Sequence, residues 1–134
     1  MIFVDSSAWL ALADGNDRQH EVARRFYERV GRGEFGQPIT TNYVIQETLT
    51  LVARRLGTSR AANLAAAMSQ SRQLSTFWIE RAHHDEAVAL MAQHDDKDWS
   101  VVDCTSFVVM HALGADTAFS FDVDFAQAGF VVLP

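Results

Sequence analysis

The chain has 134 residues, of which 49% are hydrophobic and 21% charged, as is usual for a single globular domain. Its one Cys excludes an internal disulfide and a Cys-rich zinc site, and no apolar run approaches the roughly 18 residues of a membrane span. The first residues, MIFVD, lack the basic segment of a signal peptide. We therefore expect one cytoplasmic domain over residues 1–134.

The net charge of −6 is distributed unevenly along the chain. Residues 1–72 contain nine Arg and seven acidic residues, whereas residues 73–134 contain Arg81 and Lys97 against ten acidic residues. The overall negative charge argues against indiscriminate nucleic-acid binding. The Arg residues of the first half could still hold phosphates, or they could simply form solvated helix faces.

Short apolar strands alternate with helices along the whole chain. In chain order, the predicted elements are strand 2–4, helix 7–13 with a cap from Ser6 or Ser7, helix 18–31, strand 39–41, helix 42–56, helix 59–72, strand 77–79, helix 84–94, helix 100–111, strand 118–121, a helical turn at 123–128 and strand 130–133. This alternation predicts an α/β fold in which helices cover both faces of a parallel sheet.

Two acidic residues stand where predicted strands end. Asp5 follows the first strand, and Asp122 closes the fourth. Ligands of open α/β sheets bind beyond the carboxyl ends of the strands, so both side chains are expected in a ligand crevice. Each of them could instead cap the helix that follows it.

Glu47 lies in the middle of a predicted helix, on the stripe that also carries Tyr43, Val44 and Leu51. An ionised carboxylate buried there must be protonated, paired or bound to a cation, because burying it alone is very costly. A shifted helix phase would leave Glu47 exposed and remove the anomaly.

Asp103 also has two interpretations. Together with Ser100 it fits the spacing of a capping box, but it also begins a helical stripe that continues with Phe107 and Met110. If Asp103 joined the other three acids, the clustered carboxylates would repel one another unless a metal compensated. Oxygen ligands without His or Cys favour Mg²⁺ or Mn²⁺, and carboxylate-held Mg²⁺ is typical of phosphodiester hydrolysis.

Four segments in this order and spacing resemble a known family, the PIN domain, and within it the VapC toxins of bacterial toxin–antitoxin pairs. The segments are VDSSAWLAL at 4–12, PITTNYVIQE ending at Glu47, DKDWSVVDCTSFVVM at 96–110 and FSFDVDFAQAGF at 119–130. The resemblance covers nearly the whole chain.

The resemblance implies a three-layer sandwich with a five-stranded parallel sheet of order 3-2-1-4-5, and a Mg²⁺-dependent ribonuclease that can also use Mn²⁺. The catalytic quartet it implies is Asp5, Glu47, Asp103 and Asp122, with Asp5, Asp103 and Asp122 on the metal. Supporting roles fall to Ser6, Ser120 and Asp124.

The resemblance also implies partners: an RNA substrate, an inhibitory antitoxin and a second copy of the chain. Leu64 and Met68 are candidate apolar contacts of such a homodimer. The Arg residues expected to contact RNA are Arg25, Arg29, Arg54 and Arg55. Three other functions remain open, namely a PIN-like module that binds RNA or protein without cleaving, a housekeeping ribonuclease that is no toxin, and a phosphatase of small molecules.

Overall fold

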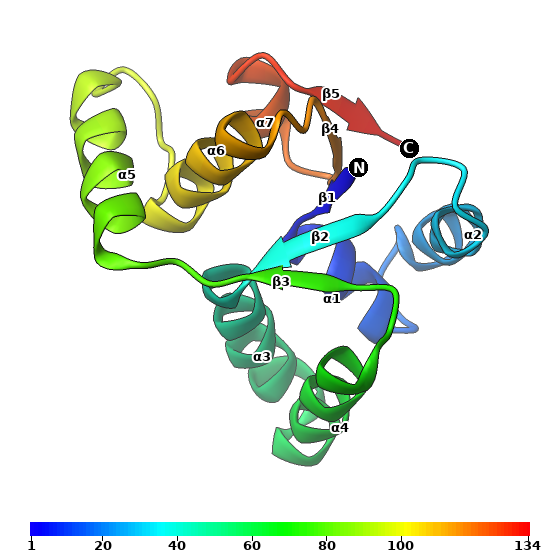
Figure 1. Cartoon of the computed structure of the whole chain (residues 1–134). Coiled ribbons are helices and arrows are strands. Elements are labelled where there is room, and N and C mark those ends of the chain that lie inside the picture. Colours follow the sequence, from blue (N-terminus) through cyan, green and yellow to red (C-terminus); the bar gives the residue numbers. More distant parts are fainter.

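The computed structural model describes all 134 residues and contains five strands and seven helices. The strands are β1 (Ile2–Val4), β2 (Pro38–Thr41), β3 (Ser75–Phe77), β4 (Thr117–Phe119) and β5 (Val131–Leu133). The helices are α1 (Ser6–Ala13), α2 (His20–Gly31), α3 (Asn42–Leu56), α4 (Thr58–Gln70), α5 (Arg81–Gln93), α6 (Val101–Leu113) and α7 (Val123–Gln127). All strand pairs are parallel, in the order β3-β2-β1-β4-β5 (Figure 1), which confirms the expected topology.

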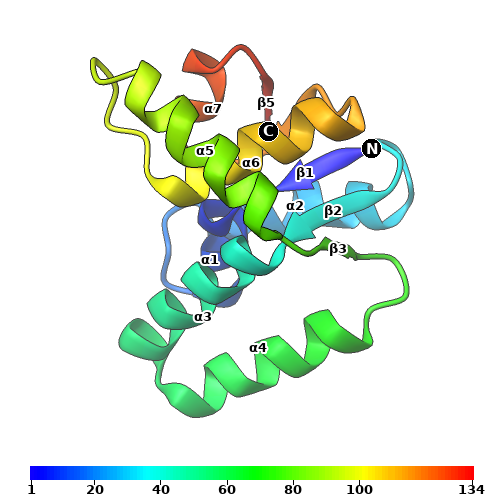
Figure 2. The ribbon, with the colours of Figure 1, turned by 60° about the vertical axis from the view of Figure 1, so that its left-hand side comes forward.

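The strand order also decides which helices share a layer. Crossovers between parallel strands are right-handed. The connections from β1 to β2 and from β2 to β3 run across the sheet in one direction, and those from β3 to β4 and from β4 to β5 run in the other, so the two sets of helices cover opposite faces. Accordingly α1, α2, α3 and α4 form one layer, and α5, α6 and α7 form the other (Figures 1 and 2). The two layers meet where α3 touches α6.

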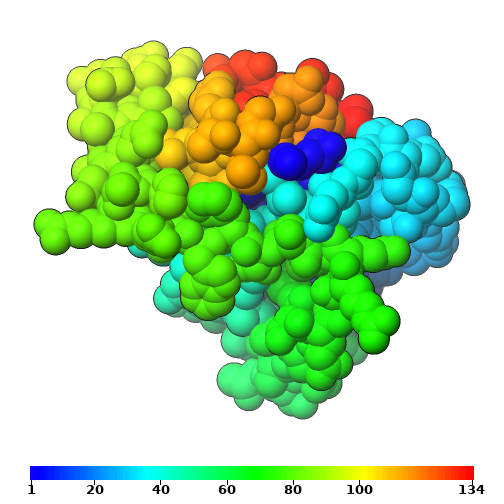
Figure 3. All heavy atoms as spheres, viewed as in Figure 1, coloured from blue at the N-terminus to red at the C-terminus, as the bar shows by residue number.

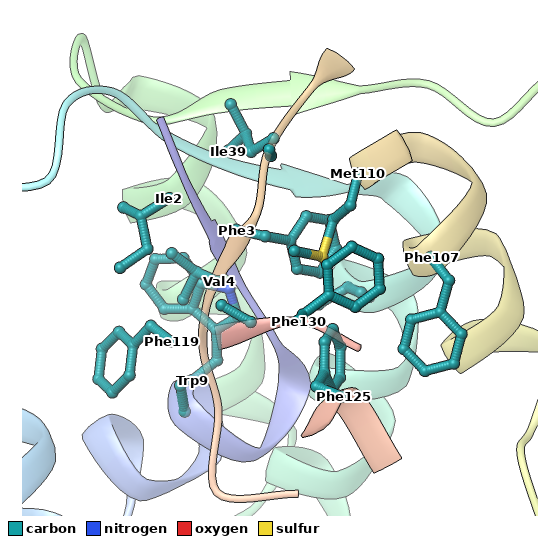
Figure 4. Close-up of a cluster of buried hydrophobic side chains, with 14 of the residues drawn as sticks. Ile2, Phe3, Val4, Trp9, Ile39, Phe107, Met110, Phe119, Phe125 and Phe130 are labelled. Atoms are coloured by element: carbon teal, nitrogen blue, oxygen red, sulfur yellow. The ribbon is translucent and has the colours of Figure 1, made fainter. Parts of the chain in front are cut away.

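The core lies around β1, whose three residues Ile2, Phe3 and Val4 are completely buried. Figure 4 shows aromatic rings from α6, α7 and β4 gathered beside this strand. Phe107 meets Phe125 edge to face, with 5.1 Å between the ring centroids. Because rings from separate segments interlock, this packing holds the carboxyl end of β1 in one position relative to α6 and α7.

The third strand lies two residues earlier than the predicted range 77–79. Ser75 to Phe77 pair with β2, while Trp78 is 70% exposed and the Ile79 amide donates a 2.7 Å hydrogen bond to Asn42 Oδ1. β3 is an edge strand in which polar residues take part in the pairing, so its apolar run was a poor guide to its limits.

Several helix starts differ from the prediction: α2 begins at His20, two residues late, and α4 at Thr58, one residue early. At α1 and α5 the start differs because an acid provides the cap. α1 begins at Ser6 because Asp5, rather than Ser6 or Ser7, is its N-cap. α5 begins at Arg81, three residues before the predicted start, because Glu80 and His83 form a capping box there.

α3 and α4 pack against each other and extend away from the sheet, forming the lower lobe in Figures 1 and 3. Met68 on α4 is only 6% exposed and packs into the main core, so it is not available as the dimer contact proposed from the sequence. Leu64 is partly buried against the same core. None of the seven helices combines the length and apolar character needed to cross a bilayer.

Candidate active site

Asp5 is the centre of the candidate site, at the carboxyl end of the central strand. Its carboxylate is 3% exposed and accepts four hydrogen bonds. Three of them reach Oδ2, from the Ser7 amide at 3.1 Å, the Ser7 hydroxyl at 2.7 Å and the Ser120 hydroxyl at 3.0 Å. Oδ1 accepts only a 3.3 Å bond from the Ser6 hydroxyl. The charged group is thus held rigidly through Oδ2, and Oδ1 keeps capacity for a ligand.

Two serines connect this carboxylate to the end of β4. The Ser7 hydroxyl donates to Asp5 and accepts the Phe121 amide at 2.9 Å, while the Ser120 hydroxyl donates to Asp5 and accepts the Asp122 amide at 3.0 Å. Ser120 was expected near the site, but Ser7 was not. Ser7 could have been found from the helix start, because the carboxylate of an Asp N-cap accepts a hydrogen bond from the backbone amide two residues later, which here is that of Ser7.

Asp103 and Glu47 enter the same region from α6 and α3. Burial raises the pKa of the Asp103 carboxyl to about 6, and the charges of Asp5 and Asp122 add to the rise, whereas hydrogen bonds from Ser100 oppose it. Burial likewise raises the pKa of Glu47; the Ser6 side chain opposes this rise, and Asp5 and Asp122 again reinforce it. Glu47 is half-buried, so the helix phase that would expose it is excluded.

The capping interpretations are confirmed for three of the four acids. Asp5 caps α1, Asp103 forms a capping box with Ser100, and Asp122 Oδ1 accepts the Asp124 amide at 2.9 Å at the start of α7. Burial raises the pKa of Asp124, with the charge of Asp122 as the next cause. Capping therefore does not compete with a place in the site, because the three helices that these residues cap begin at the carboxyl edge of the sheet.

The donor set suits a divalent cation in its chemistry. All four side chains are carboxylates, and none of them has an ion-pair partner. Burial, reinforced by the charges of Asp5 and Asp122, disfavours the charged forms of Glu47 and Asp103. Such a group favours hard cations. No three His, Cys, Asp or Glu side chains lie close enough together to enclose an ion as they stand. The four residues therefore suit a divalent cation by the type of ligand they offer and by their common place at the carboxyl edge of the sheet.

The four Arg residues expected to contact RNA differ in their surroundings. Arg25 pairs with Glu21 at 2.8 Å and Arg29 with Glu34 at 2.7 Å, both on or beside α2. Arg55 lies 3.7 Å from Asp17. Arg54 has no acidic partner, and it lines a hollow together with Glu47.

The raised pKa values predict how the stability of the metal-free protein depends on pH. Since the folded pKa of Asp103, about 6, exceeds its ordinary 3.8, the native state binds this proton more tightly than the unfolded chain. The free energy of unfolding should therefore rise by about 1 kcal/mol as the pH falls from 7.5 to 5, a figure discounted for partial exposure. Urea titrations in EDTA would measure it, and a decrease over this range would contradict it. Glu21, with a pKa of about 2, titrates below this window.

Comparison with known proteins agrees with this fold. The PIN-domain family matches residues 2–131, so the chain belongs to the PIN-domain family. The chain is 39% identical to the 23S rRNA-specific endonuclease VapC20 of Mycobacterium tuberculosis, in strains CDC 1551 / Oshkosh and ATCC 25618 / H37Rv, over 98% of this chain and 96% of that protein. These matches place it among the VapC toxins and make it a nuclease.

Solved structures show the same relationship. The crystal structure of Mycobacterium tuberculosis VapC20, described as a sarcin–ricin loop cleaving toxin, superposes with a TM-score of 0.90 at 35% identity, covering 98% of this chain and 97% of the other. FitAcB from Neisseria gonorrhoeae matches with a TM-score of 0.63 at 16% identity, over 100% of this chain and 97% of its own, and shares the fold alone.

Proposed function

We propose that this chain is a Mg²⁺-dependent endoribonuclease, the toxin of a type II toxin–antitoxin pair, and that its substrate is the sarcin–ricin loop of 23S ribosomal RNA in the cytoplasm. The supporting observation is that four carboxylates without ion-pair partners share the carboxyl edge of the sheet around Asp5. The choice of RNA rests on the likeness to VapC20, which is named for 23S rRNA and for this loop.

Asp5, Asp103 and Asp122 are the proposed ligands of the cation, with Mn²⁺ as a substitute for Mg²⁺. When bound, the cation supplies the positive charge that acidifies a water and holds a phosphate oxygen. Asp5 offers Oδ1, the oxygen with a single long hydrogen bond, while Ser7 and Ser120 keep Oδ2 in place.

Glu47 or Asp122 accepts the proton of the attacking water in the proposed reaction. A carboxyl whose pKa is raised toward neutrality, as that of Glu47 is, makes a more effective base than an ordinary carboxylate. The water oxygen bonds to phosphorus as the bond from phosphorus to the 3′ oxygen breaks. The departing 3′ oxygen takes a proton from solvent water, so the products carry a 5′-phosphate and a 3′-hydroxyl.

The test is cleavage of a synthetic RNA hairpin with the sarcin–ricin sequence, beside a scrambled hairpin, a DNA hairpin and a small phosphomonoester. We expect RNA cleavage with Mg²⁺, loss of activity in EDTA, and recovery with Mg²⁺ or Mn²⁺. Binding without cleavage would support the binding-module alternative, and hydrolysis of the phosphomonoester would support the phosphatase. Equal cleavage of the scrambled hairpin would leave a ribonuclease but contradict the proposed target.

Two partners belong to the proposal. A second copy of the chain finds support in Trp78, which is 70% exposed beside an apolar hollow of about 820 Å³ between α3, α4 and β3. An antitoxin that presents Arg would find the acidic crevice complementary. Sedimentation tests the dimer. Growth arrest by the chain alone, with rescue by the neighbouring small gene, tests the toxin against the housekeeping ribonuclease.

A further inference from the structure

A hollow of about 420 Å³ opens beside Glu47, where α3 meets α6. Its walls include Tyr43, Glu47, Leu51 and Arg54 from α3, with Val101 and Val102 from the first turn of α6. The hollow is thus bordered by one member of the acidic quartet, Glu47, and its lining residue Val102 directly precedes another, Asp103. An RNA strand whose scissile phosphate lies at the carboxylates therefore has this hollow next to its flanking nucleotides.

Arg54 provides the positive charge of this hollow. It lies seven residues after Glu47, two helical turns farther along the same face, so the two backbone positions are about 10 Å apart along the axis. The Arg side chain is exposed and lies in the last turn of α3, where the helix dipole favours a cation. A guanidinium there can reach a phosphate near the one held at the carboxylates.

The remaining basic residues do not offer the same arrangement. Most pair with acidic neighbours, and those without an ion pair are Arg18, Arg54, Arg60 and Arg72. Arg72 borders a different hollow beside Pro38, at the edge where β2 begins, opposite the carboxyl ends. Arg54, in contrast, borders a hollow together with Glu47, a member of the quartet.

Tyr43 forms the other end of the hollow, one turn before Glu47. Its hydroxyl is 3.1 Å from His84 Nδ1 and its ring meets the His84 ring edge to face, so the aromatic group is fixed by α5. A fixed, half-buried ring is the kind of surface on which an unstacked RNA base stacks. The two ends of the hollow therefore suit the two parts of one nucleotide strand, an anionic backbone and a flat base.

We propose that this hollow is an RNA subsite beside the cleavage site, in which Arg54 holds a backbone phosphate of the single-stranded substrate and Tyr43 stacks against a base. The proposal rests on the ribonuclease function proposed above and adds where the flanking nucleotides bind. Arg54 is a positioning residue here. Phosphate contacts fix register without reading sequence, so removing this contact should weaken the binding of all RNA sequences similarly.

The test is the salt dependence of RNA binding, measured by fluorescence anisotropy on a labelled sarcin–ricin hairpin with Ca²⁺ in place of Mg²⁺. Arg54→Ala should weaken binding about tenfold and lower the slope of log Kd against log salt by about 0.7, the share of one phosphate contact on a single strand. Arg72→Ala is the control, because Arg72 is an exposed Arg without an ion pair that borders the hollow beside Pro38 instead. Arg54→Lys should recover most of the slope.

Cleavage by the same variants separates this proposal from the function on which it depends. With Mg²⁺, Arg54→Ala should raise KM about tenfold and leave kcat nearly unchanged, because the contact is made equally in the ground and transition states. A wild type that cleaves RNA, with Arg54→Ala indistinguishable from Arg72→Ala, overturns the subsite and leaves the nuclease. A wild type that binds RNA with the expected loss of slope in Arg54→Ala, yet cleaves none, overturns the nuclease and supports the subsite. A wild type that neither binds nor cleaves overturns both.

Discussion

Replacing Asp103 by Asn should reduce RNA cleavage more than 100-fold while leaving the protein folded and more stable. Loss of an outer-shell partner of a metal ligand typically costs 10- to 100-fold, so loss of a proposed ligand should cost more. The structural role survives, because an Asn oxygen can still accept the 2.7 Å bond from the Ser100 amide. The raised pKa of Asp103 shows that its charge is unfavourable in the fold, and removing that charge relieves the repulsion.

The measurements are single-turnover cleavage and urea unfolding at pH 7.5 without metal. The free energy of unfolding should rise by about 1 kcal/mol, and its increase on lowering the pH to 5 should become smaller than in the wild type. Asp85→Asn is the control, since Asp85 is an exposed acid on α5 whose 3.6 Å pair with Arg81 is worth little. Full activity of Asp103→Asn would contradict its assignment as a ligand. A loss of stability would show that its charge supports the fold.

The order of the elements could be foreseen, and a grouping of the acids could be predicted, because both follow from short-range patterns joined by a general rule. Asp5 directly follows β1 as predicted, and the carboxyl ends of parallel strands share one edge of a sheet. The fourth strand ends at Phe119 rather than at residue 121, so Asp122 lies three residues beyond it, at the start of α7. Glu47 was identified because no neighbour on its own helix explains a carboxylate on an apolar stripe. These inferences need only periodicity and the energetic cost of burying charge.

Other features depend on contacts between distant segments, which no local pattern records. The true place of β3 is set by pairing with β2, since Ser75 and Thr76 show little apolar character of their own. Met68 could be assigned to the surface or the core only once the position of α4 was known. The pairing of Arg25 and Arg29 with acids, and the freedom of Arg54 beside Glu47, likewise became visible only in three dimensions.

Ser7 illustrates the same limit, because its importance comes from a hydrogen bond to the backbone of Phe121 more than a hundred residues away. Ser7→Ala removes the donor of the 2.7 Å bond to Asp5 Oδ2 and leaves the Phe121 amide without its acceptor. An unsatisfied, part-buried amide costs about 1 to 3 kcal/mol, so the free energy of unfolding should fall by that amount. Ser120 still donates to Asp5 at 3.0 Å, which should keep the fold and the residual site intact.

The effect of Ser7→Ala on catalysis should be a 10- to 100-fold loss in kcat with KM nearly constant, because Ser7 positions a proposed metal ligand without touching the RNA. Ser7→Thr keeps the hydroxyl and should retain most of the activity. Ser106→Ala is the control, since that buried hydroxyl bonds only to the Val102 carbonyl on its own helix, at 2.9 Å. An unchanged kcat in Ser7→Ala would show that Ser120 and the Ser7 amide suffice to orient Asp5. A rise in KM alone would instead place Ser7 among the groups that bind RNA.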